Sequence, residues 1–153
     1  MSAPPGQPPE LEPGWGFVSF SHSQDALLIG WSTHRLGVDI ERSDRSFKAD
    51  QLTQRFFCHQ DRQQLLDLQE EQLRTVALSQ WVIKEAAIKW QRGTLAADLD
   101  QWQCENSLSG VVHLSQGHRL RVDHVCVGPW MIAVAQKYSL HSRSSMVCLG
   151  LDG

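Results

Sequence analysis

The sequence predicts one α+β domain, in which an antiparallel sheet packs against a long central helix. Strand-like segments occupy the first and last thirds of the chain and helical segments lie between them, so the elements come in blocks rather than in strict alternation. One helical segment is apolar around almost its whole circumference, as expected of a helix at the centre of a domain. The chain has 153 residues, of which 41% are hydrophobic, and this suits one core of ordinary size.

The N-terminal segment is predicted to be an extended arm over residues 1–14, because five of the six prolines lie in the first 13 residues. The domain itself is expected at 15–137, followed by a loose tail at 138–153 that contains Ser, His and Gly. Short apolar runs between turn signals predict the first strands, at 16–21, 25–31 and 36–41.

The third of these strands carries two acidic side chains on one face. Val38 and Ile40 alternate with Asp39 and Glu41, so the two carboxylates project to the same side with Cα atoms about 7 Å apart. Like charges so placed repel unless a cation lies between them. Mg²⁺ takes a few carboxylate oxygens and completes its shell with water and phosphate, so this pair is a candidate magnesium site. A solvated strand face is the alternative interpretation.

The middle of the chain is predicted to be helical after a polar loop at 42–48. The helices are expected at 50–57, 60–68 and 71–91, and the last ends near Gly93, a residue typical of a helix C-terminus. In the last third, turn signals at 116–117 and 128–129 separate short alternating segments. These indicate antiparallel strands at 111–114, 119–127 and 130–135.

The long helix contains charges where its pattern predicts burial. Eleven of the 18 residues from Leu73 to Trp90 are apolar, yet Lys84, Glu85 and Lys89 interrupt them. Buried charges cost several kcal/mol unless they are paired, hydrogen-bonded or in contact with a ligand. The alternative is a Glu85–Lys89 ion pair at i,i+4 on a partly exposed edge of the helix.

A third polar cluster, Ser21-His22-Ser23, ends the first strand. Hydroxyl and imidazole groups at a strand end can hold phosphate oxygens, and histidine can be cationic near neutral pH. The alternative is a set of hydrogen-bonded loop residues with no ligand.

The segments FSHS, LGVDIER, RFF and WVIKEAAIK, in this order and at these separations, resemble the 4′-phosphopantetheinyl transferase superfamily. More narrowly, they look like its surfactin-synthetase-activating (Sfp) type, and the resemblance covers about residues 15–136. It implies a Mg²⁺-dependent enzyme that transfers the phosphopantetheine arm of coenzyme A to a serine of an apo-acyl or peptidyl carrier protein and releases 3′,5′-ADP. Such carriers serve fatty acid, polyketide and nonribosomal peptide biosynthesis.

The resemblance also assigns the acidic residues. Asp39 and Glu41 match the carboxylates of GVDIE, and Glu85 matches the glutamate of KEA; in the family, these hold Mg²⁺ on the pyrophosphate of coenzyme A. Glu85 is the candidate base that takes the proton of the carrier serine, directly or through water. Whether it acts mainly as a ligand or as a base is left open by the sequence.

The basic and hydroxyl residues are assigned in the same way. Lys84 and Lys89 match the two lysines of the KEA motif, which contact phosphates and offset the charge of the leaving group. Lys89 and Glu85 are therefore the expected catalytic residues. Ser21 and His22, with Lys84 and Lys89, are the expected contacts of coenzyme A.

Other matches have structural roles or depart from the family pattern. Phe56 and Phe57 of RFF are expected in the core, and Trp81 is expected to pack beside the site rather than react. Ser19 stands where the family often has Asn, and Gln7 where it has a lysine. These two departures leave one phosphate or adenine contact in doubt.

The length departs from the family as well. Sfp-type enzymes are longer and have two related halves on one chain, and this chain corresponds to the second half. The short holo-acyl-carrier-protein-synthase type instead assembles as a homotrimer with sites between subunits. We therefore expect this chain to self-associate, as a dimer or trimer, to complete its coenzyme A pocket. The alternative is a non-catalytic or partner-dependent half that binds coenzyme A or a carrier protein without turnover.

Composition narrows the partners and the compartment. The net charge is −3, which argues against a general binder of nucleic acid or of anionic membranes, and no apolar run is long enough to span a bilayer. The N-terminus lacks the basic start and apolar stretch of a signal peptide, and the four cysteines lie far apart. These features predict a cytoplasmic protein. The densest basic stretch is a candidate surface for acidic carriers and comprises Arg42, Arg45, Lys48, Arg55 and Arg62.

Overall fold

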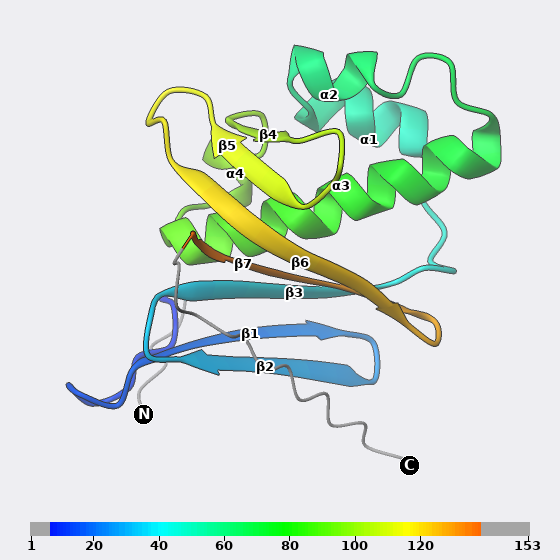
Figure 1. Cartoon of the computed structure of the whole chain (residues 1–153). Helices are drawn as coiled ribbons and strands as arrows, with labels where there is room; N and C mark the ends of the chain where they lie inside the picture. Colours follow the sequence, from blue (N-terminus) through cyan, green and yellow to red (C-terminus); the bar gives the residue numbers. More distant parts are fainter. Residues whose placement is uncertain (1–6, 139–153) are drawn as a thin grey trace.

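The computed structural model describes residues 7–138 of the chain (Figure 1). Three strands come first, then four helices, then four strands. The strands are β1 (Phe17–Ser23), β2 (Ala26–Ser32), β3 (Leu36–Arg42), β4 (Trp102–Cys104), β5 (Gly110–His113), β6 (Arg119–Val127) and β7 (Trp130–Lys137). The helices are α1 (Ala49–Phe56), α2 (His59–Gln63), α3 (Glu70–Gln91) and α4 (Leu95–Asp98).

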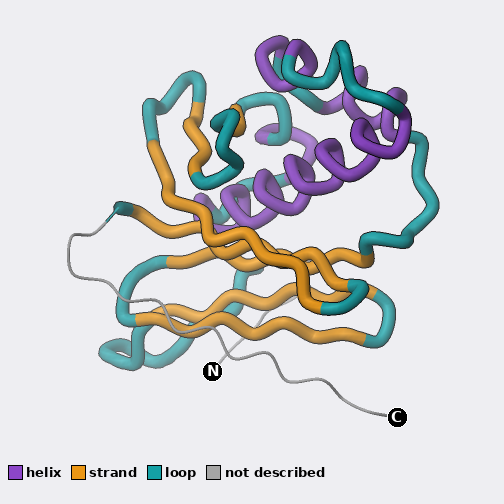
Figure 2. The backbone as a smooth tube through the Cα atoms, turned by 45° about the vertical axis from the view of Figure 1, so that its right-hand side comes forward, coloured by secondary structure: helices purple, strands orange, loops and turns teal. Residues whose placement is uncertain are grey.

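The strands form two antiparallel sheets. The larger one has five strands in the order β3-β7-β6-β5-β4, and the smaller one is the β1–β2 hairpin. Figures 1 and 2 show the hairpin running along β3 on the side away from α3. Strand β3 thus lies between the hairpin and the long helix, and residues of all three elements can meet on it.

The two faces of β3 have different surroundings. Val38 and Ile40 point to the hairpin and pack with Leu28 and Ile132. The opposite face of the larger sheet packs against α3, where the buried residues of the helix meet the inner residues of β5, β6 and β7. Because side chains alternate along a strand, Asp39 is directed to the helix side. The alternation predicted for residues 36–41 is confirmed.

Helix α3 is buried along its C-terminal two thirds, as its apolar circumference predicts. From Ala77 to Trp90 most of its side chains are inaccessible to solvent, whereas its first two turns are exposed. Gln69 and Gln72 form a capping box at its N-terminus, and Arg92 takes the left-handed conformation at its C-terminus. The helix therefore presents fixed side chains to β3.

Serine side chains, rather than backbone groups, join the hairpin to β3. The Ser19 hydroxyl accepts a hydrogen bond of 3.1 Å from the Val38 amide, and the Ser21 hydroxyl accepts one of 3.3 Å from the Ile40 amide. The Ser23 hydroxyl donates to Glu41 Oε2 at 2.8 Å. These serines recur at every second position of β1 and face the same side. They give buried donors of β3 a partner and fix the register of the hairpin.

Gly37 allows β3 to lie directly against α3. A Cβ atom at this position would come within 1.9 Å of the Ala86 carbonyl oxygen and 2.4 Å of the Trp90 amide nitrogen. Both are backbone atoms of the helix, so only glycine permits this approach. The close contact brings the carboxylate of Asp39 within reach of the next turns of α3.

The fold agrees with the α+β class, the antiparallel sheet and the central helix expected from the sequence. The sequence missed two short elements, α4 and β4, and predicted α2 to be longer than its observed five residues. Residues 7–14 of the expected arm contact the domain, since Glu10 forms an ion pair of 2.6 Å with Arg92. The expected tail at 138–153 lies outside the described residues apart from Tyr138. None of the described helices combines the length and apolarity that crossing a membrane requires.

We predict that Gly37→Ala lowers the free energy of unfolding by roughly 2 kcal/mol or more, because the new methyl group must displace backbone atoms of α3. Urea unfolding followed by tryptophan fluorescence measures the change. Gly117→Ala is the matched control: a Cβ there meets nothing within 4 Å, and its φ of 66° costs only about 1 kcal/mol. Equal losses in the two variants would contradict the assigned role of Gly37.

Candidate active site

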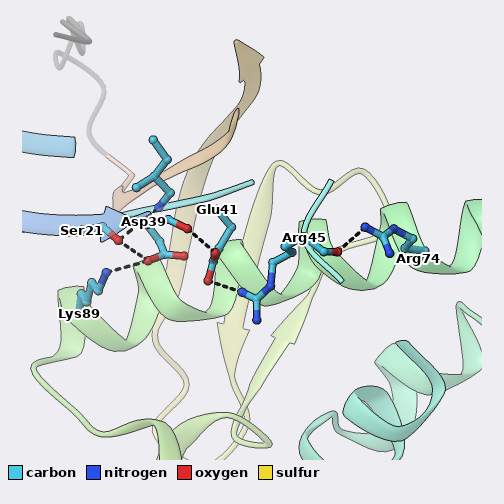
Figure 3. A network of polar contacts seen from close by, with 8 residues as sticks. Ser21, Asp39, Glu41, Arg45, Arg74 and Lys89 are labelled. Carbon is cyan, nitrogen blue, oxygen red and sulfur yellow. Dashed lines mark hydrogen bonds and ion pairs between the residues drawn. The ribbon is translucent and has the colours of Figure 1, made fainter. Parts of the chain in front are cut away.

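Asp39 is the centre of the candidate site. Its side chain is 2% exposed, and its Oδ1 accepts a hydrogen bond of 2.7 Å from Ser21 and one of 2.7 Å from the Lys89 ammonium. The three residues come from β3, β1 and α3 (Figure 3). A carboxylate this deeply buried is stable only when it is paired and hydrogen-bonded, so a solvated strand face is excluded. Burial raises the pKa of Asp39, although Lys89 and Ser21 act in the opposite direction.

Glu41, two residues along β3, is held in a similar way. Its Oε1 forms an ion pair of 2.5 Å with Arg45, and its Oε2 accepts the hydrogen bond from Ser23. Its side chain is less buried than that of Asp39 and reaches the surface of the molecule. The two carboxylates therefore lie on one face of β3, each with a serine on one side and a cation on the other.

Glu85 completes the acidic group from α3. It lies one turn before Lys89 on the helix and is mostly buried. The pKa of Glu85 is raised to about 8, mainly by burial and also by the negative charges of Asp39 and Glu41, while Lys89 acts in the opposite direction. Glu85 therefore keeps its proton at neutral pH in this arrangement. Of the two strand carboxylates, Asp39 is the one to which the Glu85 side chain is hydrogen-bonded.

The Ser-His-Ser segment is divided between the two faces of β1. Ser21 and Ser23 point to β3 and are bonded to the carboxylates, whereas His22 lies on the opposite face and is exposed. The Ser21 hydroxyl already donates to Asp39 and accepts from Ile40. The structure therefore uses Ser21 to fix Asp39, and it does not bring His22 to the carboxylates.

Lys84 lies apart from the other predicted residues, in the interior of the protein. It has no exposed surface and forms an ion pair with Asp61 of α2, and its ammonium donates to the Leu99 carbonyl at 3.1 Å. The ammonium also lies 4.4 Å from the centre of the Phe57 ring. Asp61 in turn accepts from the Cys104 amide at 2.9 Å. In this arrangement the ammonium joins α3 to α2 and β4, and the structure does not bring it to Asp39 or Lys89.

Phe56 and Phe57 of the predicted motifs pack against or within the core, as the sequence predicts. Phe57 is buried, and Phe56 packs its ring against Trp81 with centroids 6.0 Å apart. Trp81 lies at the edge of the core on the helix side of the sheet.

The carboxylate oxygens are of the kind that a hard divalent cation binds. Within residues 7–138, Asp39 Oδ2 is buried and meets no hydrogen-bond donor of ordinary geometry, while Asp39 and Glu85 lie close enough to share a proton. Burial is the main cause of the raised pKa of Glu85, and the negative charges of Asp39 and Glu41 add to it; a cation would offset this repulsion. In the described part of the chain, however, no three potential ligand groups are arranged to hold a metal ion. Asp39 and Glu41 are instead turned towards Lys89 and Arg45.

The sequence missed two residues of these networks, Arg45 as a partner of Glu41 and Asp61 as the partner of Lys84. Arg45 follows Glu41 by four residues and was assigned only to a surface stretch. Asp61 lies 23 positions before Lys84, and no local pattern links them. The cavity between the N-terminal arm and β1, with a volume of about 420 Å³, also escaped prediction; none of the predicted site residues lines it.

Comparison with known proteins places this arrangement in a family. The family model of the 4′-phosphopantetheinyl transferase superfamily matches residues 35–139, which is more than half of the chain and includes β3 and α3. The chain belongs to this superfamily. A comparison with curated proteins gave no match.

Membership agrees with the fold and with the site. The matched region contains the GVDIE strand and the KEA helix, whose carboxylates and Lys89 meet in the structure. It begins after the β1–β2 hairpin, so the serines that hold the two strand carboxylates come from outside the matched region. As a member of this superfamily, the chain has a phosphopantetheinyl transferase-like domain.

The placement of Lys84 predicts a loss of stability when its charge is removed. Lys84→Met should lower the free energy of unfolding by about 3–5 kcal/mol, because Asp61 would remain buried without its cation. Chemical unfolding measures this, with Lys48→Met at an exposed position as the control. A Lys84→Met protein of unchanged stability that has lost affinity for coenzyme A would instead support the phosphate contact expected from the sequence.

The pKa of Glu85 predicts how stability changes with pH in the absence of divalent cations. Between pH 4.5, its ordinary value, and about 8, the native state holds a proton that the unfolded state has released, so stability falls as pH rises. Glu85→Gln removes this dependence, so from pH 4.5 to pH 8.5 its free energy of unfolding should rise by roughly 4 kcal/mol relative to that of the wild type. Urea unfolding in EDTA at the two pH values measures the difference.

Glu71→Gln, at an exposed position of the same helix, is the control and should follow the wild-type profile. Parallel profiles of Glu85→Gln and the wild type would show that Glu85 ionises normally.

Proposed function

We propose that this chain is an Sfp-type phosphopantetheinyl transferase, which moves the phosphopantetheine arm of coenzyme A to a serine of an apo-carrier protein with Mg²⁺. The observation that supports this most is the meeting of Asp39, Glu41, Glu85 and Lys89 on β3 and α3, inside the region that matches the family. A cluster of three carboxylates with a partly exposed lysine beside it suits chemistry on a pyrophosphate.

Asp39, Glu41 and Glu85 would hold the cation. Their oxygens are the hard ligands that Mg²⁺ prefers, and a cation would give the buried Asp39 Oδ2 a partner. When bound, Mg²⁺ would neutralise the pyrophosphate of coenzyme A and orient it.

Glu85 and Lys89 carry the proposed chemistry. The serine oxygen of the carrier forms a bond to the β-phosphorus, and the bond from this phosphorus to the oxygen of 3′,5′-ADP breaks. A cation held beside Glu85 would lower its raised pKa and leave it ionised, so that it could accept the serine proton, directly or through water. Lys89, whose side chain is 30% exposed, reaches solvent and can offset the charge that develops on the leaving 3′,5′-ADP.

Other residues of the site position these groups or bind substrate. Ser21 orients Asp39 through their hydrogen bond, and Lys89 is the proposed phosphate contact on α3. His22 is exposed on the far face of β1, so a role for it in binding coenzyme A requires a ligand that extends over the hairpin. Lys84 is proposed to stabilise the helix layer through Asp61.

We further propose that two copies of the chain associate through the hairpin. Val18 faces Trp31 and Phe20 faces Ile29 across β1 and β2, and these side chains share one face with Leu27. Leu27 and Ile29 are each 49% exposed and Trp31 is 61% exposed, and the face carries no Lys, Arg, Asp or Glu. A second copy offers the same surface, which is apolar apart from His22 opposite Leu27, and its burial would favour a symmetric dimer.

The alternative is a half-domain that binds coenzyme A or a carrier protein without turnover. Such a half-domain would use the same binding residues, but it would not transfer the phosphopantetheine group. A direct assay of transfer separates the two functions.

We predict that the chain, incubated with coenzyme A, Mg²⁺ and apo-carrier protein, adds the mass of one phosphopantetheine group to the carrier. Glu85→Gln should lower the rate by about 10²–10⁴-fold, because the proposed base is lost. Mass spectrometry of the carrier measures the product, and Glu71→Gln on the exposed face of α3 serves as the control.

Coenzyme A that binds without any mass gain on a panel of acyl and peptidyl carriers would favour the non-catalytic alternative. The same assay tests association. If the site is completed by a second copy, the rate per chain rises with chain concentration and Ile29→Asp abolishes that rise.

A further inference from the structure

Arg45 holds one of the carboxylates assigned to the cation. Its NH1 lies 2.5 Å from Glu41 Oε1, and Ser23 donates to the other oxygen, so both oxygens of Glu41 have a partner (Figure 3). Any cation that binds Glu41 must therefore compete with Arg45. The same relation holds at the other end of the cluster, where Lys89 is paired with Asp39.

The backbone of the loop that carries Arg45 is fixed to α3. The Arg74 guanidinium donates to the Ser43 carbonyl at 3.2 Å and to the Arg45 carbonyl, and it lies over the Phe47 ring at 5.2 Å. Figure 3 shows Arg74 reaching from the helix to this loop. The side chain of Arg45 is 32% exposed, and its guanidinium contacts Glu41 and lies over the Phe47 ring at 5.8 Å, so the side chain can turn once the ion pair is broken. It can change partner while the loop stays in place.

Arg45 differs from its neighbour Arg42 in this respect. Each guanidinium lies over an aromatic ring, but Arg42 forms two hydrogen bonds, of 2.7 and 2.5 Å, to Asp44 of its own loop, so its charge is balanced outside the carboxylate cluster. Within residues 7–138, Glu41 is the ion-pair partner found for Arg45. When a cation takes Glu41, the guanidinium loses that partner and becomes available to an anion at the same place.

We propose that Arg45 is an exchange residue of this site: it pairs with Glu41 in the cation-free protein and turns to the pyrophosphate oxygens of coenzyme A when a divalent cation occupies Glu41. This inference rests on the proposed function. Guanidinium groups bind phosphate oxygens through paired hydrogen bonds, which suits the exchange. Arg45 thereby neutralises Glu41 in the absence of substrate, and the same guanidinium binds the substrate once the cation has taken its place at Glu41.

The exchange predicts effects of opposite sign in two binding measurements on Arg45→Met. Titration calorimetry with Mg²⁺ alone should show binding about threefold tighter than in the wild type, because no guanidinium competes for Glu41. Titration with coenzyme A in saturating Mg²⁺ should show binding about tenfold weaker, because one charged contact to phosphate is lost. Dephospho-coenzyme A, which keeps the pyrophosphate, should lose affinity by the same factor.

Two further variants control the experiment. Arg121→Met removes an arginine paired with Asp123 on β6 and should change neither titration by more than the loss of one distant charge. Arg45→Lys keeps the charge and should restore most of the affinity for coenzyme A. If Arg45→Met does not fold, as judged by circular dichroism, Arg45→Gln carries the same expectations.

The outcomes separate this inference from the proposed function. If wild-type protein binds Mg²⁺ and coenzyme A but Arg45→Met binds both as the wild type does, or binds both more weakly, the exchange is overturned and the transferase proposal stands. If the wild-type protein does not bind coenzyme A in the presence of Mg²⁺, the proposed function fails and the inference fails with it.

Discussion

The pairing of Asp39 with Lys89 is the interaction on which the rest of the site depends. It joins the middle of β3 to the last turns of α3, and Ser21 of the hairpin binds the same oxygen. The carboxylate is nearly inaccessible to solvent, so its charge is tolerated only because both partners are in place. Three layers of the protein therefore meet at one oxygen atom, and the positions of Glu41 and Glu85 follow from it.

The ion pair between Asp39 and Lys89 forms because β3 lies close to α3 and both side chains point into the space between them. Gly37 lets the strand approach the helix, and the two-residue period then turns Asp39 to the same side. On the helix, Glu85 and Lys89 are four residues apart and lie on one face. The charged side chains therefore meet for three reasons: Gly37 lets β3 and α3 lie close, alternation along the strand directs Asp39 to the helix, and the four-residue spacing on α3 directs Glu85 and Lys89 to the strand.

These periods also explain what the sequence could predict. The placement of Asp39 and Glu41 on one face, the buried helix and the core position of Phe57 follow from local patterns, and the structure confirms them. Lys84 precedes Lys89 by five residues, about 140° around the helix, so the two ammonium groups point apart. The expectation that both lysines serve the same ligand ignored this angle. The partner of Lys84, Asp61, and the elements α4 and β4 depend on tertiary contacts that no local pattern shows.

The serines of β1 have a consequence beyond the site. Strand β3 is the outermost strand of its sheet, and such a strand exposes amides that can recruit a strand from another chain and begin aggregation. Hydroxyl groups of Ser19 and Ser21 accept from two of these amides, so the edge is closed without extending the sheet. A sixth strand paired through its backbone would also close this edge. Its backbone carbonyls would then take the place of the serine hydroxyls, and Asp39 would lose its hydrogen bond from Ser21.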